Sequence, residues 1–457
     1  MFLHYTTGKT GRQTPFCHEI RAKRLKVVSQ NQLKHFVEPD EVGQDIYRLI
    51  SQLYPICRSI TGDGFRKTMD ILRRYIPLVT HEVQSGKRVF DWTIPREWNI
   101  RDAFVKNSKG ERVVDFRKSN LHVLNYSIPI RKTVSLAALK EHLYSLPDYP
   151  DWIPYKTSYY KDNWGFCLSH NQLMGLEEGD YEVFIDSNLE NGHLTFGEYY
   201  LSGQQTEEIL ISCHACHPSL CNDNLSGVGL ATFLARFLSS GRRRYSYRFL
   251  FLPGTIGAIT WLCLNEGQTS KIRHGLVITG VGDTGKITYK KSRLGNEEID
   301  RAADHVLRHS EEDYMIIDFS PCGYDERQYC SPGFNLPVGR LSRTPDGEYP
   351  EYHTSADNLD FVQSRFLGDS FAKTLAIIDI LESNRTYLNL NAKCEPQMSK
   401  RGLDSESKAI HLAMQWVLNF SDGSHSLLDI ADRSNLRFDL IVSAAAKLLG
   451  KGLLREL

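Results

Sequence analysis

Cysteine, histidine and acidic residues gather most densely between positions 213 and 224. The segment reads CHACHPSLCNDN and follows a predicted buried strand, EEILIS, at 207–212. In open α/β sheets, ligands bind at the carboxyl ends of strands, which is where this segment lies. These residue types can attach haem, hold a structural zinc ion or build a hydrolytic metal centre.

The first two chemistries are disfavoured by the pattern around the segment. Cys213 to His217 spells C-x-x-C-H, which is a haem-attachment motif, but such attachment needs an exported chain and no secretory signal is recognisable. A structural zinc site needs a second pair of closely spaced ligands. Cys263, Cys322 and Cys330 form no such pair.

A hydrolytic metal centre accounts for more of the sequence. Zinc in such centres takes imidazole nitrogen and carboxylate oxygen and keeps an open position. His214 ends one predicted strand, Asp223 precedes a helix, Asp283 follows GLVITGVG, and His353 lies in EYHTSAD. Each alone has an ordinary explanation as a helix cap or a hydrogen-bonded histidine. Their joint placement favours the metal centre.

The elements that must position these residues alternate between strand and helix. YRFLFL at 247–252 predicts a buried strand and is followed by a helix from about 256, and a long helix covers 366–382. Although 247–264 is nearly apolar, Pro253 and two glycines interrupt it, so we expect no membrane span. Strand and helix alternation predicts an α/β fold, with a mixed central sheet and helices on both faces.

Two further units accompany the predicted α/β domain. Short alternating runs between Pro, Gly and Asn indicate a small inserted β-rich domain, and helices at 406–420, 427–434 and 439–449 before LLREL indicate a winged helix. The predicted division is a basic leader at 1–39, the α/β domain at 40–82 and 151–393, the insert at 83–150, and the winged helix at 400–457.

Composition narrows the class of protein. The 457 residues carry 55 Lys and Arg against 55 Asp and Glu, and 41% are hydrophobic, which excludes a wholly disordered or collagen-like chain. The balanced charge, within the predicted winged helix as well, disfavours nucleic acid and membrane partners. We expect a cytoplasmic protein with reduced thiols, and possible homo-oligomers through the winged helix.

The order of motifs resembles the co-catalytic zinc aminopeptidases. The chain is most similar to a bacterial branch with an inserted β-rich domain and a C-terminal winged helix, often encoded near polysaccharide or other biosynthetic genes. The resemblance covers about residues 40–457. It rests on YPICRSITGDG, VFDWTIPREWNIRDAF, CHACHPSLCNDNLSG, FLFLPGTIG, GVGD, DERQYCSPG and EYHTSADN.

The resemblance implies a role for each candidate ligand. His214 matches the first zinc ligand, Asp223 the carboxylate that bridges two metals, Asp283 a second ligand of the metal held by His214, and His353 the imidazole of the other metal. His217 is an additional imidazole, either a substitute ligand or a substrate contact. Cys216 stands where the peptidases have an orienting Asp.

The main departure lies at Gly254 and Thr255. The aminopeptidases have adjacent glutamates there, one the general base and one a metal ligand, whereas this chain has neither carboxylate. Loss of a positioned base typically costs about 10²–10⁴-fold in rate. Loss of a ligand weakens one metal position, so we expect one zinc ion in preference to two.

The loop around DERQY is expected to contact substrate. In the peptidases this loop lines the pocket, so Arg327 could clamp a carboxylate and Asp325 or Glu326 could receive an amine, with Tyr329 beside them. An internal network of salt bridges is the alternative. Arg58 is expected either to face the pocket or to serve packing.

The expected function follows from these features. It is a metal-dependent, aminopeptidase-like enzyme that acts on a small peptide-like or amino-acid-derived substrate in a biosynthetic pathway. Because the base is replaced by Gly254, two alternatives stay open: a non-hydrolytic acyl or aminoacyl transfer on the same fold, or a catalytically silent binding or scaffold protein.

Overall fold

An eight-stranded mixed sheet forms the centre of the molecule. The computed structural model describes residues 38–403 and 406–457, so nearly all of the predicted leader lies outside the described residues. The sheet order is β1-β10-β12-β11-β13-β16-β14-β15. The strands are β1 (Val79–Gln84), β10 (His193–Leu201), β11 (Glu208–His214), β12 (Ser246–Leu252), β13 (Ile272–Ile278), β14 (Ile287–Lys290), β15 (Tyr314–Ile317) and β16 (Val338–Ser342).

The middle of the sheet is parallel and fully buried. β11 pairs in parallel with β12 and β13, and β13 pairs in parallel with β16, while β1, β10 and β14 add antiparallel pairs. Every residue of β11 and β12 is buried, as expected for strands covered on both faces. The carboxyl ends of these strands therefore open onto a common edge, where the sequence predicted the site.

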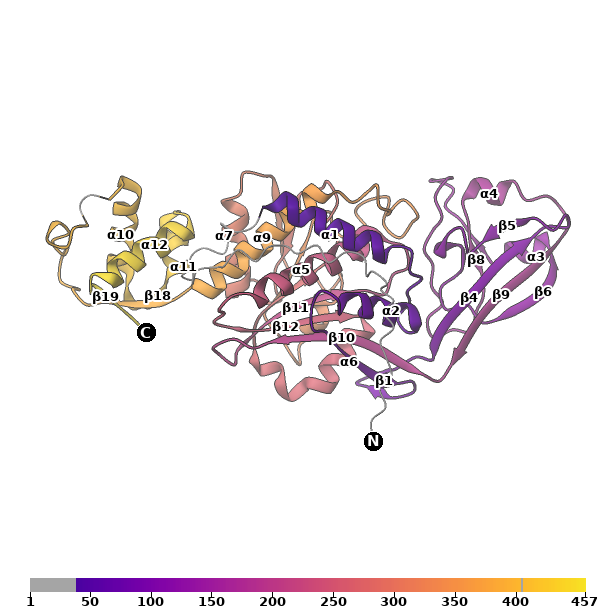
Figure 1. The fold of residues 1–457 in the computed structure, drawn as a ribbon, viewed down its shortest axis with the longest axis horizontal. Coiled ribbons are helices and arrows are strands. Elements are labelled where there is room, and N and C mark those ends of the chain that lie inside the picture. Colours follow the sequence, from indigo (N-terminus) through magenta and orange to yellow (C-terminus); the bar gives the residue numbers. More distant parts are fainter. Residues whose placement is uncertain (1–37, 404–405) are drawn as a thin grey trace, which may run out of the picture.

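Helices cover both faces, as predicted. α1 (Pro39–Leu53), α5 (Gly227–Ser239) and α9 (Ser364–Ser383) pack together on one face, and α6 (Ile256–Asn265) lies across the sheet from them (Figure 1). α2 (Asp63–Leu72) and α7 (Glu298–Arg308) complete the layers. α1 and α9 meet closely because Gly43 has no side chain: a Cβ there would lie 2.0 Å from the carbonyl oxygen of Ser364.

The apolar stretch at 247–264 is the interior strand and helix that the sequence predicted. β12 ends at Leu252 and α6 begins at Ile256, with Pro253 and Gly254 in the turn between them. Within residues 38–403 and 406–457, no helix combines the length and the apolarity that crossing a bilayer requires.

The inserted β-rich unit is larger than the sequence predicted. Its sheet has the order β5-β4-β9-β6, with β4 (Glu97–Lys106), β5 (Arg112–Asp115), β6 (Ile130–Ser135) and β9 (Asp180–Glu190). The predicted end at 150 is too early, because β9 pairs with β4 and β6 before the chain returns to the central sheet as β10. The smaller elements are β2 (Arg88–Val89), β3 (Trp92–Thr93), α3 (Leu136–Lys140), β7 (Leu143–Tyr144), β8 (Phe166–Cys167) and α4 (His170–Met174).

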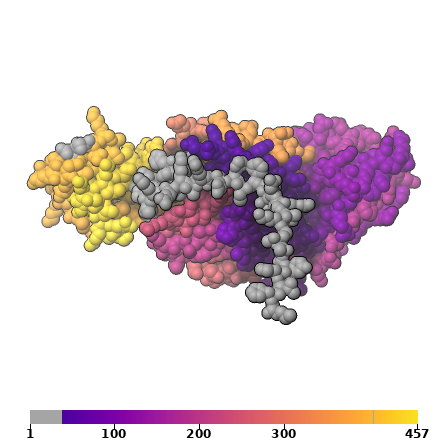
Figure 2. All heavy atoms as spheres, in the orientation of Figure 1, coloured from indigo at the N-terminus to yellow at the C-terminus, as the bar shows by residue number. Residues whose placement is uncertain are grey.

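The C-terminal unit is a winged helix. Its helices are α10 (Lys408–Phe420), α11 (Leu427–Ser434) and α12 (Phe438–Gly450), close to the predicted bounds, and its sheet is β18 (Asp422–Ser426), β17 (Thr386–Asn389) and β19 (Leu454–Glu456). Because β17 is part of this sheet, the unit starts before the predicted residue 400. The winged helix and the insert lie at opposite ends of the molecule, with the α/β domain between them (Figures 1 and 2).

A cluster of charges holds the winged helix against α7. The carboxylate of Asp432 accepts hydrogen bonds from Arg301 and Arg308, each at 3.0 Å, and lies 3.1 Å from His305 Nδ1. On its other side, His305 Nε2 accepts the backbone N–H of Phe438 at 3.1 Å. The start of α12 is thus bonded directly to the α/β domain.

Candidate metal centre

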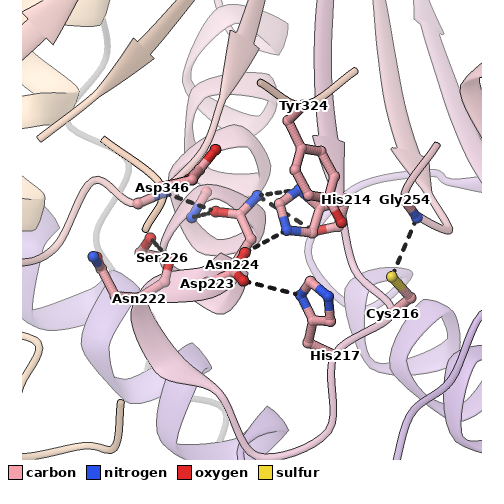
Figure 3. A network of polar contacts seen from close by, with 12 residues as sticks. His214, Cys216, His217, Asn222, Asp223, Asn224, Ser226, Gly254, Tyr324 and Asp346 are labelled. Atoms are coloured by element: carbon pink, nitrogen blue, oxygen red, sulfur yellow. Dashed lines mark hydrogen bonds and ion pairs between the residues drawn. The ribbon is translucent and has the colours of Figure 1, made fainter. Parts of the chain in front are cut away.

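The carboxylate of Asp223 lies among three imidazoles. His214 Nε2 is 2.6 Å from Oδ1, while His353 Nε2 and His217 Nδ1 are 3.0 Å and 3.4 Å from Oδ2. Figure 3 shows Asp223 between the rings of His214 and His217. His214 is the last residue of β11, and His217 and Asp223 follow in the segment that leads to α5. Residues from one strand end and two loops therefore converge at one edge of the sheet.

Backbone hydrogen bonds fix the segment that carries Asp223. The carboxylate of Asp357 accepts the N–H groups of Asn222 at 2.6 Å, Asp223 at 2.9 Å and Cys221 at 3.2 Å. Asn224, which follows Asp223 across a cis peptide bond, accepts the N–H of Gly227 at 3.0 Å. Asp357 lies in the EYHTSADN motif, and its role is to hold the loop that presents Asp223.

Burial and mutual attraction set the ionisation of this cluster. Burial lowers the pKa of His214 to about 4, although the Asp223 carboxylate opposes the shift. Burial also lowers the pKa of His353. Burial works against ionisation of Asp223, but His217 and His214 hold its pKa well below the usual range. At neutral pH the centre thus offers neutral imidazole from His214 and His353 and a carboxylate, the protonation states that bind metals.

Buried polar atoms at the centre lie close together without forming hydrogen bonds, which indicates a ligand. His217 Nδ1 and His353 Nε2 are 3.4 and 3.0 Å from Asp223 Oδ2, but neither contact has the geometry of a hydrogen bond. Buried polar atoms without a partner are rare in folded proteins. One ligand atom from each of His214, His217 and Asp223 lies within 4.8 Å of the others. Imidazole nitrogen and carboxylate oxygen are the ligands that zinc takes at catalytic sites, so these residues fit a zinc ion.

The structure brings together three of the four predicted ligands and adds His217. His214, Asp223 and His353 converge as expected. Asp283 does not join them: its Oδ2 accepts the side-chain amide of Asn222 at 2.8 Å and its Oδ1 accepts the hydroxyl of Thr344 at 2.7 Å. Asp283 therefore stabilises the loop that carries Asp223 through its hydrogen bond with Asn222.

The predicted substrate loop divides into interior residues and residues with free polar atoms. It forms the short helix α8 (Glu326–Tyr329). Glu326 is buried against Lys290, with Oε1 and Nζ 2.9 Å apart, and the buried Tyr329 hydroxyl lies 2.9 Å from that of Ser212. In contrast, Asp325 Oδ2 and Arg327 Nε are buried without a hydrogen-bond partner. Within this loop, Asp325 and Arg327 are thus the residues with a buried polar atom that makes no hydrogen bond.

Burial raises the pKa of Asp325 to about 7. The usual value of an aspartate is about 3.9, so between about pH 4 and pH 7 the folded state holds a proton that the unfolded state has lost. The contribution of Asp325 to stability is therefore present at low pH and is lost as the pH rises. We expect Asp325→Asn, relative to wild type, to gain a few kcal/mol in unfolding free energy from pH 5 to pH 8.

Urea unfolding at pH 5, 6.5 and 8 measures this dependence. The matched control is Asp313→Asn, because the side chain of Asp313 is 83% exposed and pairs with the exposed Lys286. Parallel stability profiles for wild type and Asp325→Asn would contradict the expectation.

Aromatic residues that the sequence did not single out complete the centre. The ring of Tyr155, from the inserted unit, stands edge-on to His217 at 5.1 Å and to His353 at 5.2 Å, and its N–H donates to the carbonyl of His353 at 2.7 Å. The ring of Tyr324 stacks on His214 at 3.6 Å. Tyrosine is frequent here, with 22 in the chain, and no spacing distinguishes these two.

Two charged residues near the centre have different roles. Arg58 is fully buried and donates from Nε to the carbonyl of His217 at 2.9 Å, so it fixes the loop and does not face solvent. Asp346, which no motif indicated, accepts from Arg340 at 2.8 Å through Oδ2, while its Oδ1 is buried without a partner. Burial raises the pKa of Asp346 to about 7.

Comparison with known proteins places the chain in a family. Residues 47–384 match the model of a domain of unknown function, DUF4910, and residues 385–456 match a winged helix-turn-helix model. A protein of Clostridium acetobutylicum, named as a polysaccharide biosynthesis protein with an aminopeptidase-like domain, is 54% identical over 428 residues, which are 92% of this chain and 98% of the relative.

Solved structures are also similar to this chain. The crystal structure of a protein described as a peptidase from Clostridium acetobutylicum is 53% identical, covers 94% of this chain and 100% of its own, and has a TM-score of 0.91. A zinc aminopeptidase from Bacillus subtilis is 11% identical, with a TM-score of 0.55 over 74% of this chain and 94% of its own, so the two share the fold. The chain therefore belongs to the DUF4910 family, with an aminopeptidase-like α/β domain followed by a winged helix.

Proposed function

We propose that this protein is a metal-dependent, aminopeptidase-like enzyme of polysaccharide biosynthesis that acts on an amide or peptide-like bond of a small substrate. One zinc ion would be held by His214, His217, Asp223 and His353. The observation that supports this most strongly is the group of buried imidazole nitrogens close to the Asp223 carboxylate, two of which form no hydrogen bond with it. The biosynthetic setting is suggested by the name of the Clostridium acetobutylicum relative.

The residues of the chain would orient both the metal and the substrate. When bound, a zinc ion polarises a carbonyl oxygen and lowers the pKa of water. Asp357, Arg58 and Tyr155 hold the loops that carry the ligands. Asp325 and Arg327 keep buried polar atoms free, which suits an amine and a carboxylate of an amino-acid-derived substrate.

A transfer reaction without hydrolysis is the second candidate. Gly254, at the position of the aminopeptidase general base, has no side chain that could take a proton from water, and the neighbouring Thr255 supplies no carboxylate. An enzyme that passes an acyl or aminoacyl group to an acceptor other than water would be protected from wasteful hydrolysis by such a loss.

Zinc content is the first measurement. Elemental analysis of the purified protein should find about one zinc per chain, and His214→Ala and His353→Ala should lose it because each removes a ligand. His81→Ala is the matched control, since His81 lies 44% exposed beside Glu198, on the edge strand β1. No zinc in the wild type after incubation with zinc chloride would contradict the enzyme proposals and favour a binding protein.

A further inference from the structure

The space beside Gly254 is already occupied by Tyr324. A Cβ atom on Gly254 would lie 2.1 Å from the hydroxyl oxygen of Tyr324, 2.8 Å from its Cζ and 3.0 Å from its Cε1. The backbone of Gly254 does not have a positive φ, so its conformation suits any residue. What prevents a side chain at position 254 is therefore the phenol ring and not the backbone.

Tyr324 is held firmly in this place. Its ring stacks on His214 with 3.6 Å between centroids and 23° between planes. Figure 3 shows the two stacked rings, with Gly254 and Cys216 next to them. Its N–H donates to Glu326 Oε2 at 3.0 Å, and Glu326 is anchored by the buried Lys290. The preceding residue, Gly323, has a φ of +141°, and a Cβ there would lie 2.1 Å from Glu326 Oε1. The ring therefore has little freedom to move aside.

A tyrosine hydroxyl in the space of a glutamate carboxylate replaces a proton acceptor with a hydrogen-bond donor. A glutamate at 254 would present a carboxylate, which accepts a proton from water. The phenol of Tyr324 places an O–H group there instead, which can donate a hydrogen bond. A second carboxylate is absent at Cys216, the position where the aminopeptidases have an aspartate. The sulfur of Cys216 accepts the N–H of Gly254 at 3.2 Å.

We propose that Tyr324 is a specificity-determining residue that fills the side-chain space of position 254 and thereby keeps a carboxylate out of that position. This inference rests on the proposed metal centre. It adds that Gly254 and Tyr324 act as a pair, so that a glutamate restored at 254 cannot work while Tyr324 is present. Position 254 therefore supplies no side chain that could activate water.

A stability cycle tests the pairing without any metal. Gly254→Ala should lower the melting temperature of the wild type by at least about 2 °C, because overpacking a filled site is destabilising. In a Tyr324→Ala background the same substitution should have little effect. Gly267→Ala is the control, since no atom lies within 4 Å of a Cβ there. An equal loss in both backgrounds would overturn the pairing.

A restored base tests the chemical consequence. With zinc at saturation and leucine p-nitroanilide as the probe, Gly254→Glu/Tyr324→Ala should hydrolyse at least about 100-fold faster than Gly254→Glu or Tyr324→Ala alone. Equal rates for Gly254→Glu and the double variant would overturn the inference, as would a zinc-loaded double variant without gain. Loss of zinc from Tyr324→Ala would instead assign Tyr324 to support of His214. A wild type without zinc would contradict the proposed function alone, because the stability cycle still decides the pairing.

Discussion

Asp223→Asn is expected to abolish zinc binding while the protein stays folded. The carboxylate of Asp223 is approached by all three imidazoles, at 2.6, 3.0 and 3.4 Å, and no other predicted carboxylate ligand joins them among the described residues. Loss of an outer-shell partner typically lowers metal affinity about 10- to 100-fold, so loss of the shared ligand should cost more. Competition with a chelator gives the affinity, and circular dichroism confirms folding.

Asp283→Asn is the matched control for this experiment. Asp283 is buried in the same region, but its oxygens accept from Asn222 and Thr344, so its replacement should lower stability and leave about one zinc per chain. If Asp283→Asn lost zinc as completely as Asp223→Asn, the carboxylate would be a ligand in the loaded protein. The structural assignment of Asp283 as a brace would then be wrong.

Lys290→Met is expected to destabilise the α/β domain by about 3–5 kcal/mol, the usual cost of removing one partner from a buried ion pair. Lys290 and Glu326 are 1% and 0% exposed, with Nζ and Oε1 2.9 Å apart. Among the described residues, the cation that still pairs with the Glu326 carboxylate in the variant is Arg340, at 3.8 Å. Urea unfolding followed by tryptophan fluorescence measures the loss.

The double variant Lys290→Met/Glu326→Gln separates the pair from general packing damage. Glutamine keeps an oxygen that can accept the N–H of Tyr324, now accepted by Glu326 at 3.0 Å, and carries no charge that burial penalises. Much of the lost stability should therefore return. A double variant as unstable as Lys290→Met would show that the methionine itself, and not the isolated carboxylate, causes the loss.

Hydrophobic patterning explains why the elements were predictable. β12 and α6 differ in period and are separated by Pro253, and α11 has the predicted bounds, Leu427–Ser434, marked by the Ser426 and Asn435 caps. The pairing of strands was less predictable. β9 alternates like any half-covered strand, and only its hydrogen bonds to β4 and β6 assign it to the inserted sheet. The boundaries predicted at 150 and 400 therefore differ from the limits of the two sheets, and no predicted strand covered β17.

The candidate site shows the same contrast between features that the local sequence determines and contacts that depend on distant segments. His214 ends β11, and Asp223 and His353 lie in connecting segments whose order along the chain is visible in the sequence, so their convergence was expected. The contacts of the Asp283 side chain could not be predicted from the sequence. They depend on whether the folded chain brings its carboxylate to an imidazole or to the side-chain amide of Asn222.

By itself, the sequence determined the α/β class, the additional units and the histidine and aspartate types that make a metal centre possible, because periodicity and residue chemistry are local properties. Tertiary structure alone decided that Tyr155 closes over His353 and that Tyr324 fills the space beside Gly254. Tyr155 and His353 are brought together by the return of a chain segment from another unit. The physical reason is that occupancy of a volume depends on every segment packed around it, and no spacing in one segment records what another will place there.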